Sequence, residues 1–297
     1  MESIPAVAII EWSPEFNEKN VARAGGSRDG STRISPTADA VPPQAAQVKS
    51  AVRTLEVLEF LATHEGSHSL TSMQRALGYP KSSLHALTRT LVQRGWVETD
   101  ASGNLYRIGI RALLVGVAYI DTDVVVQLSR DTLDWLAEET GETVHLARLD
   151  RTDVVYLSTR TSKHFLRPGA RAGRRMPAYA TSLGKALLAE RSNAEVEEML
   201  PDRLEPLTPN TIVNRRKLLA DLRATRARGY AIDLEENTLG LRCLGAALRV
   251  ESPPIYAISL SVPVARMTKE HEEEMVASLL HAGERLRALI LPGLRAL

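Results

Sequence analysis

The pentapeptide HEGSH, residues 64–68, has two histidines and a glutamate at the H-E-x-x-H spacing of many zinc proteases. On a helix this spacing would place His64 and His68 one turn apart on the same face as metal ligands, with Glu65 beside them as a general base. Such a site would make the protein a metal-dependent hydrolase. The motif has this meaning only on a continuous helix and with a third ligand further along the chain.

Both requirements fail in the sequence. Gly66 lies between the two histidines, and a glycine costs a helix about 1 kcal/mol relative to alanine. Only polar residues follow before Leu70, and no downstream His or Glu has the spacing of a third ligand. We therefore expect HEGSH to be a solvated loop at a helix end without metal, and we keep the hydrolase as an alternative.

Other catalytic and cofactor motifs are incomplete. A phosphate-binding P-loop around Gly184-Lys185 would need glycine at 179 and Ser or Thr at 186, where the chain has Tyr179 and Ala186. The segment GLRCLG, from Gly240, has the wrong glycine spacing for a dinucleotide loop, and no G-x-S-x-G nucleophile elbow occurs. The sequence therefore predicts a protein that is not an enzyme and has no cofactor.

Composition points to a globular protein in a reducing compartment. Of the 297 residues, 44% are hydrophobic and 25% are charged, and the net charge is +1, so any basic surface must be local. The single cysteine, Cys243, excludes an intramolecular disulfide framework. The longest apolar run, ALLVGVAYI, has about half the length of a membrane-spanning helix. We expect a cytoplasmic protein without a membrane partner.

The chain becomes periodic only after a segment dense in Gly, Ser and Pro. Residues 1–46 lack the apolar pattern of a packed element and are predicted to be a disordered tail. An amphipathic helix follows, with an apolar face at three- and four-residue steps made of Val48, Ala51, Val52, Leu55, Leu58 and Ala62. A capping box at Thr71 and Gln74 predicts a second, short helix that stops at Gly78.

A third helix and a hairpin complete this unit. After Tyr79-Pro80, the segment KSSLHALTRTLVQRG places Leu84, Leu87 and Leu91 on one helical face and ends at Gly95. The segments WVETD and LYRIG then flank the turn ASGN, as in a β-hairpin. Helix, short helix, turn, helix and hairpin form the order of a winged helix-turn-helix DNA-binding domain, which we assign to residues 47–109.

In such a domain the second helix of the helix-turn-helix enters the major groove, while basic and hydroxyl side chains hold phosphates. The face opposite the leucines, together with flanking arginines, predicts a DNA-contact set of Arg53, Lys81, Ser82, Ser83, His85, Thr88, Arg89 and Arg107. Between Ala45 and Arg111 there are eight Lys and Arg against five Asp and Glu. Plain solvation of a surface helix is the alternative for each of these side chains.

The remainder of the chain predicts an α+β domain. Residues 110–122 (RALLVGVAYI and its flanks) form an apolar linker helix, and residues 123–297 mix helices with hairpin-forming strands rather than alternating them strictly. This pattern favours a largely antiparallel sheet. The last helix has an apolar face of Met275, Leu279, Ala282, Leu286 and Leu289.

Five segments together resemble the IclR family of bacterial transcriptional regulators: VKSAVRTLEVLEFLA, GYPKSSLHALTRTLVQRGWVE, GRRMPAYATSLGKALLAE, RGYAIDLEENTLGLRCLGAAL and AISLSVPVARMT. The resemblance implies a C-terminal GAF-like domain that binds a small, often carboxylate-bearing effector and alters the occupancy of double-stranded operator DNA. It also implies a homodimer or homotetramer, with the linker helix used in dimerisation. Repression and activation both remain open, and a ligand-independent architectural DNA-binding protein is a further alternative.

The resemblance also implies the position of the effector pocket. It falls on Ala180, Thr181, Asp233, Leu241, Cys243, Ser259 and Ser261. Strand alternation puts Leu241 and Cys243 on one face, and Ser259 and Ser261 likewise share a face. The alternatives are structural: Asp233 caps a turn, Cys243 belongs to the core and the serines satisfy the sheet. The arginines of RPGARAGRR (Arg167, Arg171, Arg174 and Arg175) either attract an anionic effector or form a solvated loop, which we favour.

Overall fold

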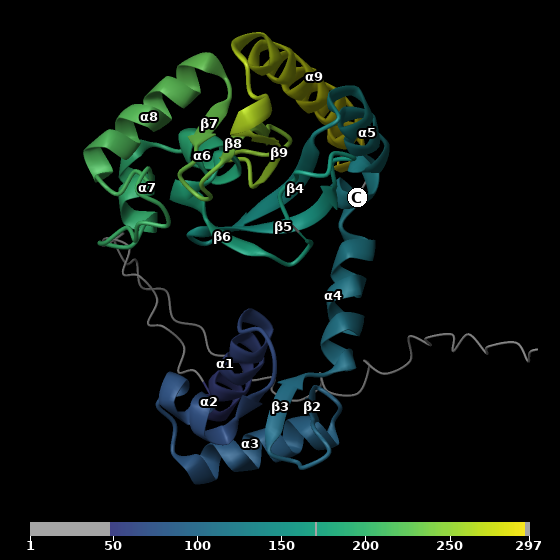
Figure 1. The fold of residues 1–297 in the computed structure, drawn as a ribbon, viewed down its shortest axis with the longest axis vertical. Helices are drawn as coiled ribbons and strands as arrows, with labels where there is room; N and C mark the ends of the chain where they lie inside the picture. The colour runs from purple at the N-terminus through teal and green to yellow at the C-terminus, as the bar shows by residue number, and fades with distance from the viewer. Residues whose placement is uncertain (1–47, 170, 295–297) are drawn as a thin grey trace, which may run out of the picture. The chain divides into compact units, whose positions relative to one another are not determined.

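The computed structural model describes residues 48–169 and 171–294, so the predicted tail lies outside the described residues. The first part, which we call the head, contains α1 (Lys49–Thr63), β1 (His68–Ser69), α2 (Leu70–Leu77), α3 (Lys81–Gln93), β2 (Val97–Thr99) and β3 (Leu105–Ile108) (Figure 1). The three strands form an antiparallel sheet in the order β1-β3-β2. The predicted winged helix-turn-helix is therefore confirmed, and β1 is an addition to the predicted hairpin.

The face of α1 that packs into the head differs from the predicted one. Val57, Phe60 and Leu61 are buried, whereas Val48 and Leu55 are 67% and 59% exposed. The buried residues form a core with Met73, Leu84, Leu91, Val97 and Tyr106 from the other elements of the head. The helix has two overlapping apolar stripes, and its packing partners select the stripe that contains the large Phe60 side chain.

The start of α2 also differs from the prediction. Ser69 is the N-cap, and its side chain accepts a hydrogen bond from the backbone N–H of Ser72, so Thr71 lies inside the helix. The predicted end is correct, because Gly78 adopts the left-handed conformation with φ 70°.

The linker helix α4 (Ile110–Thr122) leads to the C-terminal domain. This domain contains α5 (Val124–Thr140), β4 (Thr143–Asp150), β5 (Asp153–Arg160), β6 (Arg175–Pro177), α6 (Ser182–Ala189), α7 (Asn193–Met199), α8 (Arg215–Arg228), β7 (Ala231–Leu234), β8 (Leu241–Leu248), β9 (Tyr256–Pro263) and α9 (Lys269–Leu294), with short 3-10 turns at Ala178–Ala180 and Val264–Arg266. Its six-stranded sheet has the order β6-β5-β4-β9-β8-β7, and every neighbouring pair is antiparallel. The predicted α+β class is confirmed.

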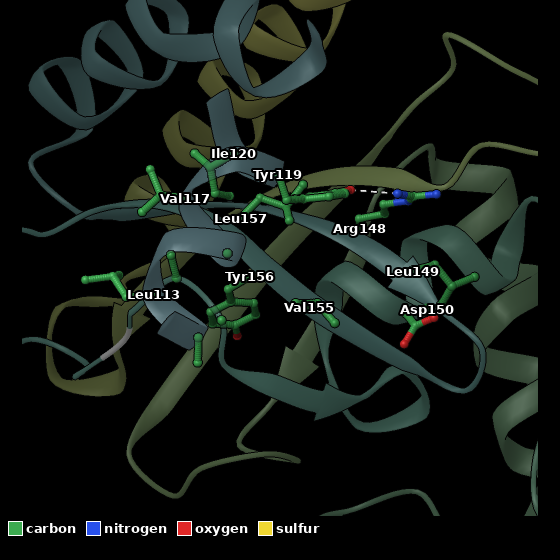
Figure 2. A pocket seen from close by; sticks show the side chains of 14 residues that line it. Leu113, Val117, Tyr119, Ile120, Arg148, Leu149, Asp150, Val155, Tyr156 and Leu157 are labelled. Atoms are coloured by element: carbon green, nitrogen blue, oxygen red, sulfur yellow. Dashed lines mark hydrogen bonds between the residues drawn. The ribbon is translucent and has the colours of Figure 1, made fainter. Parts of the chain in front are cut away.

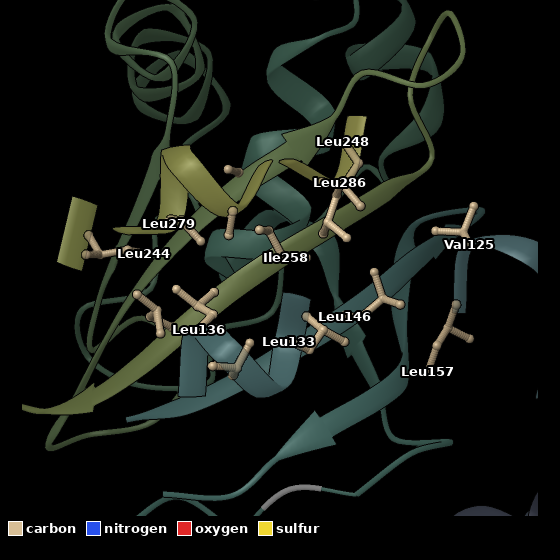
Figure 3. Packing of buried hydrophobic residues seen from close by; sticks show 14 of the residues in the cluster. Val125, Leu133, Leu136, Leu146, Leu157, Leu244, Leu248, Ile258, Leu279 and Leu286 are labelled. Carbon is tan, nitrogen blue, oxygen red and sulfur yellow. The ribbon is translucent and has the colours of Figure 1, made fainter. Parts of the chain in front are cut away.

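One face of this sheet is covered by α5 and α9, which lie side by side (Figure 1). Strand residues such as Leu146, Leu244 and Ile258 pack there against Leu133, Leu136, Leu279 and Leu286 of the two helices (Figure 3). The predicted face of α9 is correct for Met275, Leu279, Ala282 and Leu286. Its last member is Ile290, which is fully buried, rather than Leu289, which is 46% exposed.

The opposite face is covered by α6, with α8 beyond it. Ala147 and Ala257 form a second apolar cluster there with Leu183, Leu187, Leu218 and Leu222. Further along the same face the apolar residues give way to polar ones, which form the site described below. Within the described residues, no single helix is long and apolar enough to cross a membrane; α4 and α5 reach that length only as a pair bent by 78°.

Candidate functional sites

The outward face of α3 is the candidate nucleic-acid interface. Lys81, Ser82, His85 and Arg89 are exposed, and Ser83 is half-buried, while Leu84 and Leu91 pack into the head. The helix sequence KSSLHALTRTLVQ contains two cations and no acidic residue. This face therefore offers cations and short hydrogen-bonding groups without an attached negative charge.

Thr88 is a correction to the predicted contact set. Its side chain is fully buried on the inner face, about one helical turn from both Leu84 and Leu91. Its hydroxyl donates to the backbone carbonyls of Leu84 and His85, at 3.0 and 3.1 Å. A threonine can occupy an inner helical position because its hydroxyl is satisfied by the preceding turn, so Thr88 positions the helix and offers nothing to DNA.

The two flanking arginines have partners within the head. Arg53 donates from Nη1 to the hydroxyl of Ser83 at 3.3 Å and lies over the Tyr79 ring at 4.9 Å. Arg107 of β3 donates to Glu98 of β2 from both Nε and Nη2, at 3.1 and 2.9 Å. Arg53 thus remains a cation beside the start of α3, whereas Glu98 offsets much of the charge of Arg107.

HEGSH lies across three local structures. His64 follows the end of α1 and stacks on Phe60 at 4.1 Å, Gly66 has φ 88°, and His68 begins β1. The ring nitrogen Nδ1 of His64 is 2.9 Å from the Phe60 carbonyl. The described residues include no group of three or more His, Cys, Asp or Glu side chains that could hold a metal ion. HEGSH therefore forms the connection between α1 and β1.

The C-terminal domain contains a buried polar face on its sheet. Two rows of paired residues cross neighbouring strands: Asp233, Cys243, Ser261 and Thr143 form one, and Gly245, Ser259, His145 and Thr159 form the other. Cys243 Sγ and Ser261 Oγ are 3.2 Å apart, and His145 Nδ1 and Thr159 Oγ1 are 3.1 Å apart. These side chains share one face because paired residues of an antiparallel sheet point the same way.

Gly245 lets α6 approach this face closely. A Cβ atom at this position would lie 2.5 Å from the backbone carbon and oxygen of Ser182, the first residue of α6. The N-cap of α6 is Thr181, whose hydroxyl accepts from the Gly184 N–H at 3.0 Å. Because Gly245 has no side chain, the start of α6 can lie directly against the polar rows.

A small cavity of about 30 Å³ lies among these polar groups. It is lined by His145, Tyr156, Pro168, Gly169, Arg174, Asn237, Thr238, Leu241, Cys243 and Ser261. The structure thus brings the predicted Leu241, Cys243 and Ser261 together, with Asp233 paired to Cys243 across the strands. Ser259 lies in the neighbouring row, and Ala180 and Thr181 are buried outside the lining.

Asp233 has two roles at this position. Its Oδ1 accepts hydrogen bonds from the backbone N–H groups of Glu236 and Asn237, at 2.7 and 3.4 Å, so it caps the turn after β7. Burial, together with the nearby Glu236 carboxylate, raises the pKa of Asp233 to about 7. Because desolvation disfavours the ionised form, the cavity has a weakly acidic group beside it near neutral pH.

His145 and Tyr156 are neutral members of the lining. Burial, with a smaller contribution from the positive Arg174, lowers the pKa of His145 to about 4. Burial raises the pKa of the Tyr156 hydroxyl, and the two rings stack at 4.8 Å. These two rings therefore contribute polar, uncharged groups to the lining of the cavity.

Sequence reasoning missed His145, Tyr156 and Asn237, and did not distinguish Arg174 within its cluster. For His145 a signal existed, because strand alternation in TVHLARL puts it on the same face as Thr143. Among the clustered arginines, Arg175 donates to both Asp150 and Asp153 at 2.7 Å and begins β6, while Arg167 donates to the His164 carbonyl. The solvated-loop interpretation is therefore wrong for Arg175.

A second feature joins the linker helix to this domain. Asp123, between α4 and α5, caps α5 through Oδ1 and accepts hydrogen bonds at Oδ2 from the hydroxyls of Tyr119 and Tyr256, at 3.1 and 2.8 Å. Arg148 of β4 donates to the Tyr119 hydroxyl at 2.6 Å (Figure 2).

A groove of about 670 Å³ runs beside this network, lined by Leu113, Val117 and Ile120 of α4 and by Val155, Tyr156 and Leu157 of β5. Tyr156 therefore borders both this groove and the polar cavity.

Comparison with known proteins matches two family descriptions. Residues 50–101 match the IclR helix-turn-helix domain and residues 117–288 match the bacterial transcriptional regulator IclR C-terminal description. The chain is 35% identical to the transcriptional repressor IclR of Escherichia coli strain K12 over 249 residues, which cover 82% of this chain and 91% of the relative.

Two solved structures have a similar fold. The crystal structure of IclR from Thermotoga maritima has a TM-score of 0.62 at 27% identity and covers 82% of this chain and 99% of that one. The structure of an IclR homologue from Microbacterium hydrocarbonoxydans complexed with 4-hydroxybenzoate has a TM-score of 0.66 at 21% identity, covers 80% of this chain and 99% of that one, and supports the fold alone.

Proposed function

Because the chain belongs to the IclR family of DNA-binding transcriptional regulators, we propose that it reads operator DNA through the outward face of α3 and releases or retains that DNA in response to a small acidic effector. The observation that carries the DNA-binding role is a helix face with Lys81, His85 and Arg89 exposed and no acidic residue on the helix. Family membership also confirms that the protein is not an enzyme, which removes the metal-dependent hydrolase.

The test of DNA recognition uses an operator fragment selected with the full-length wild-type protein. We expect Arg89→Ala to weaken binding by about 1–3 kcal/mol, because Arg89 lies on the exposed face that would enter the major groove. Fluorescence anisotropy at several salt concentrations measures both the affinity and its salt slope. Binding should weaken steeply as salt rises, since phosphate contacts release counterions.

Two variants control this experiment. Arg216→Ala removes an exposed cation from α8 in the C-terminal domain and should leave binding unchanged. Arg107→Ala should cost less than Arg89→Ala, because Glu98 already pairs with Arg107. Equal affinity of wild-type and Arg89→Ala proteins, or affinity that stays constant over a tenfold range of salt, contradicts the proposed interface.

For the effector we propose the polar cavity of the C-terminal domain. Hydroxyl, thiol, imidazole and amide groups at Ser261, Cys243, His145 and Asn237 suit a small ligand held by a few hydrogen bonds. A related structure contains 4-hydroxybenzoate, which is a small carboxylic acid. A ligand-independent architectural protein would give a DNA footprint that responds to no metabolite, and footprinting with a bound acid distinguishes the two.

We propose that the Asp123 network couples the cavity to the linker helix. β4 carries both His145 of the cavity and Arg148 of the network, and β9 carries both Ser261 and Tyr256. A ligand that moves these strands therefore alters the hydrogen bonds that fix Tyr119 near the end of α4. Such coupling requires the ligand to bind the two states with different affinity, typically by about 1–3 kcal/mol.

We also propose a homodimer through α4, with further pairing to a tetramer on DNA. Among the described residues α4 has no buried side chain, and Ile110, Leu113, Leu114 and Val115 are each between 58% and 64% exposed. Large contiguous apolar surfaces of this kind mark interfaces. Leu114→Asp should shift the protein toward monomer in analytical ultracentrifugation, whereas Leu239→Asp, at a similarly exposed loop position, should not. The site of action would be the bacterial cytoplasm.

A further inference from the structure

We propose that Lys185 is a positioning residue of the effector site, which acts through Glu236 to hold the loop 235–240 closed over the polar cavity. This loop connects β7 with β8 and contributes Asn237 and Thr238 to the lining of the cavity. The inference rests on the proposed effector function and adds to it the part of the wall that moves and the contact that fixes it.

The cavity has to enlarge before it can hold an organic effector. Its volume is about 30 Å³, whereas binding sites for small molecules usually enclose about 300–1,000 Å³. The structure therefore describes a closed state of the site. Strands β4, β5, β8 and β9, which carry the sheet residues of the lining, are joined to one another by backbone ladders. The movement is therefore expected in a connection between strands, and the loop 235–240 is such a connection.

Glu236 anchors this loop from its buried side. Glu236 is only 3% exposed, while residues 238–240 further along the loop are exposed. Its backbone N–H donates to Asp233 Oδ1 at 2.7 Å, and its carbonyl accepts from the Thr211 hydroxyl at 2.6 Å. The loop thus has an exposed outer part and a buried anchor.

Lys185 holds the side chain of that anchor. Every residue of α6 is buried, and Lys185 is only 1% exposed. Its Nζ lies 2.5 Å from Glu236 Oε1 and 2.9 Å from Asp221 Oδ2 of α8. Among the described residues, no other Lys, Arg or His nitrogen lies within 4.0 Å of the Glu236 carboxylate. Lys185 therefore ties the loop to α6 and α8.

The energetics of a buried ion pair favour a positioning role for this contact. Because both charges must leave water, such a pair is often no more stabilising than hydrophobic residues of the same volume. It does fix the two side chains relative to each other, since a buried charge that loses its partner is strongly unfavourable. Glu236 Oε2 has no hydrogen-bond partner in the described part of the chain, so the contact with Lys185 is what orients the carboxylate.

The one cysteine of the chain reports on the position of the loop. Cys243 lines the cavity together with Asn237 and Thr238, and it is half-buried. A cavity of about 30 Å³ has no room for a maleimide ring beside the sulfur, so fast labelling of Cys243 requires the wall to open. Burial raises the pKa of the Cys243 thiol, and the charge of Lys185 makes a smaller contribution that lowers it. Since the thiolate is the reactive form, loss of this charge would by itself slow labelling.

The experiment measures the rate at which fluorescein maleimide labels the full-length protein under native conditions. We expect Lys185→Met to label at least tenfold faster than the wild type, because the loop then opens more often. Glu236→Gln keeps an oxygen that can accept from Lys185 and should label at an intermediate rate. Because the two residues act through one contact, the double variant should label no faster than Lys185→Met.

Hydrogen–deuterium exchange followed by mass spectrometry gives a second measurement that does not depend on the thiol. Amide exchange should become faster in Lys185→Met within peptides that cover residues 235–240, and it should stay unchanged in α9. If Lys185→Met does not fold, Glu236→Gln provides the same test with a smaller perturbation.

Glu190→Gln is the matched control. Glu190 caps the far end of α6 and pairs there with Arg249 at 2.6 Å, and neither residue lines the cavity. This variant removes an ion pair from the same helix and should label at the wild-type rate. Urea denaturation of each variant measures how much labelling occurs through global unfolding.

The outcomes separate this inference from the function it rests on. Labelling of Lys185→Met and Glu236→Gln at the wild-type rate, or faster labelling that only follows the loss of global stability, overturns the role of Lys185. Equal acceleration in Glu190→Gln overturns it as well. These measurements contain no effector, so their failure leaves the effector proposal standing. A DNA footprint that responds to no metabolite rejects the effector function, and with it the role of the loop at an effector site, even where Lys185 is found to hold the loop.

Discussion

Alternate residues of β9 point into two different environments. Ile258, Leu260 and Val262 enter the leucine-rich core under α5 and α9, and all three are fully buried. Ser259 and Ser261 point to the opposite face, where α6 begins and where the polar cavity lies. Both faces are buried, but only one is filled by groups that gain free energy from leaving water.

The difference separates the residues that stabilise the domain from those available for binding. On the apolar face, tight packing leaves no room for a ligand and each methyl group contributes to stability. On the polar face, hydroxyl, thiol and imidazole groups bond to one another and enclose a small space. We therefore expect substitutions on the two faces to have effects of different size and on different observables.

The largest expected effect comes from the apolar face. Leu260→Ala should lower the free energy of unfolding by about 2–5 kcal/mol, because it removes a fully buried side chain and leaves a cavity. Urea denaturation followed by the fluorescence of Trp135, which packs against this core, measures the loss. Leu239→Ala, at a position 59% exposed, is the control and should change stability by less than about 0.5 kcal/mol. Equal losses would mean that this face does not hold the domain together.

The second prediction concerns the pH dependence of the polar face. With its pKa raised to about 7, Asp233 keeps its proton in the folded protein between about pH 4 and pH 7, where the unfolded chain has released it. Folding is therefore less favourable as pH rises through this window, by about 1.4 kcal/mol per pH unit. Asp233→Asn removes the titration and keeps a side-chain oxygen that can accept from Glu236 N–H.

The variant should therefore gain stability relative to the wild type as the pH increases from 5 to 7, by a few kcal/mol in total. Urea midpoints measured at three pH values test this expectation. Asp202→Asn makes the same substitution at an exposed position and is the control. A stability difference between Asp233→Asn and wild type that stays constant with pH would show that Asp233 is ionised throughout, and the cavity would then have a negative neighbour.

The order of elements could be predicted because its signals are local. Gly78 ends α2 as predicted, and the segments WVETD and LYRIG contain β2 and β3 on either side of the predicted turn. The buried stripe of α1 could not be chosen in the same way, because two apolar stripes overlap on that helix and only the packing of the head distinguishes them. The burial of Thr88 could not be predicted either. A polar residue can be buried when its hydroxyl forms a hydrogen bond to its own helix.

The cavity was predictable only in part, for a related reason. Alternation along a strand places Cys243 with Leu241 and Ser261 with Ser259, so pairs on one strand follow from the sequence. Arg174 and Asn237 lie on separate loops 63 positions apart in the chain, and nothing local brings them to one space. The fold also distinguishes Arg174 from Arg175, since only the position of Asp150 and Asp153 decides which guanidinium is paired.

The smallest expected effect on stability comes from a comparison of two adjacent residues of β9, one on each face of the sheet. Ser261→Ala removes one hydroxyl that lies 3.2 Å from the Cys243 thiol, and we expect the free energy of unfolding to change by about 1 kcal/mol or less. Val262→Ala, at the next position of β9, removes apolar volume from the opposite face and should cost more. Any acid that stabilises the wild type should in turn bind Ser261→Ala more weakly and bind Val262→Ala with unchanged affinity, which thermal shift with and without ligand measures for both variants. If Ser261→Ala proved the more destabilising of the two and left acid binding intact, the polar face would be a structural feature, and the division between a face that folds and a face that binds would be wrong.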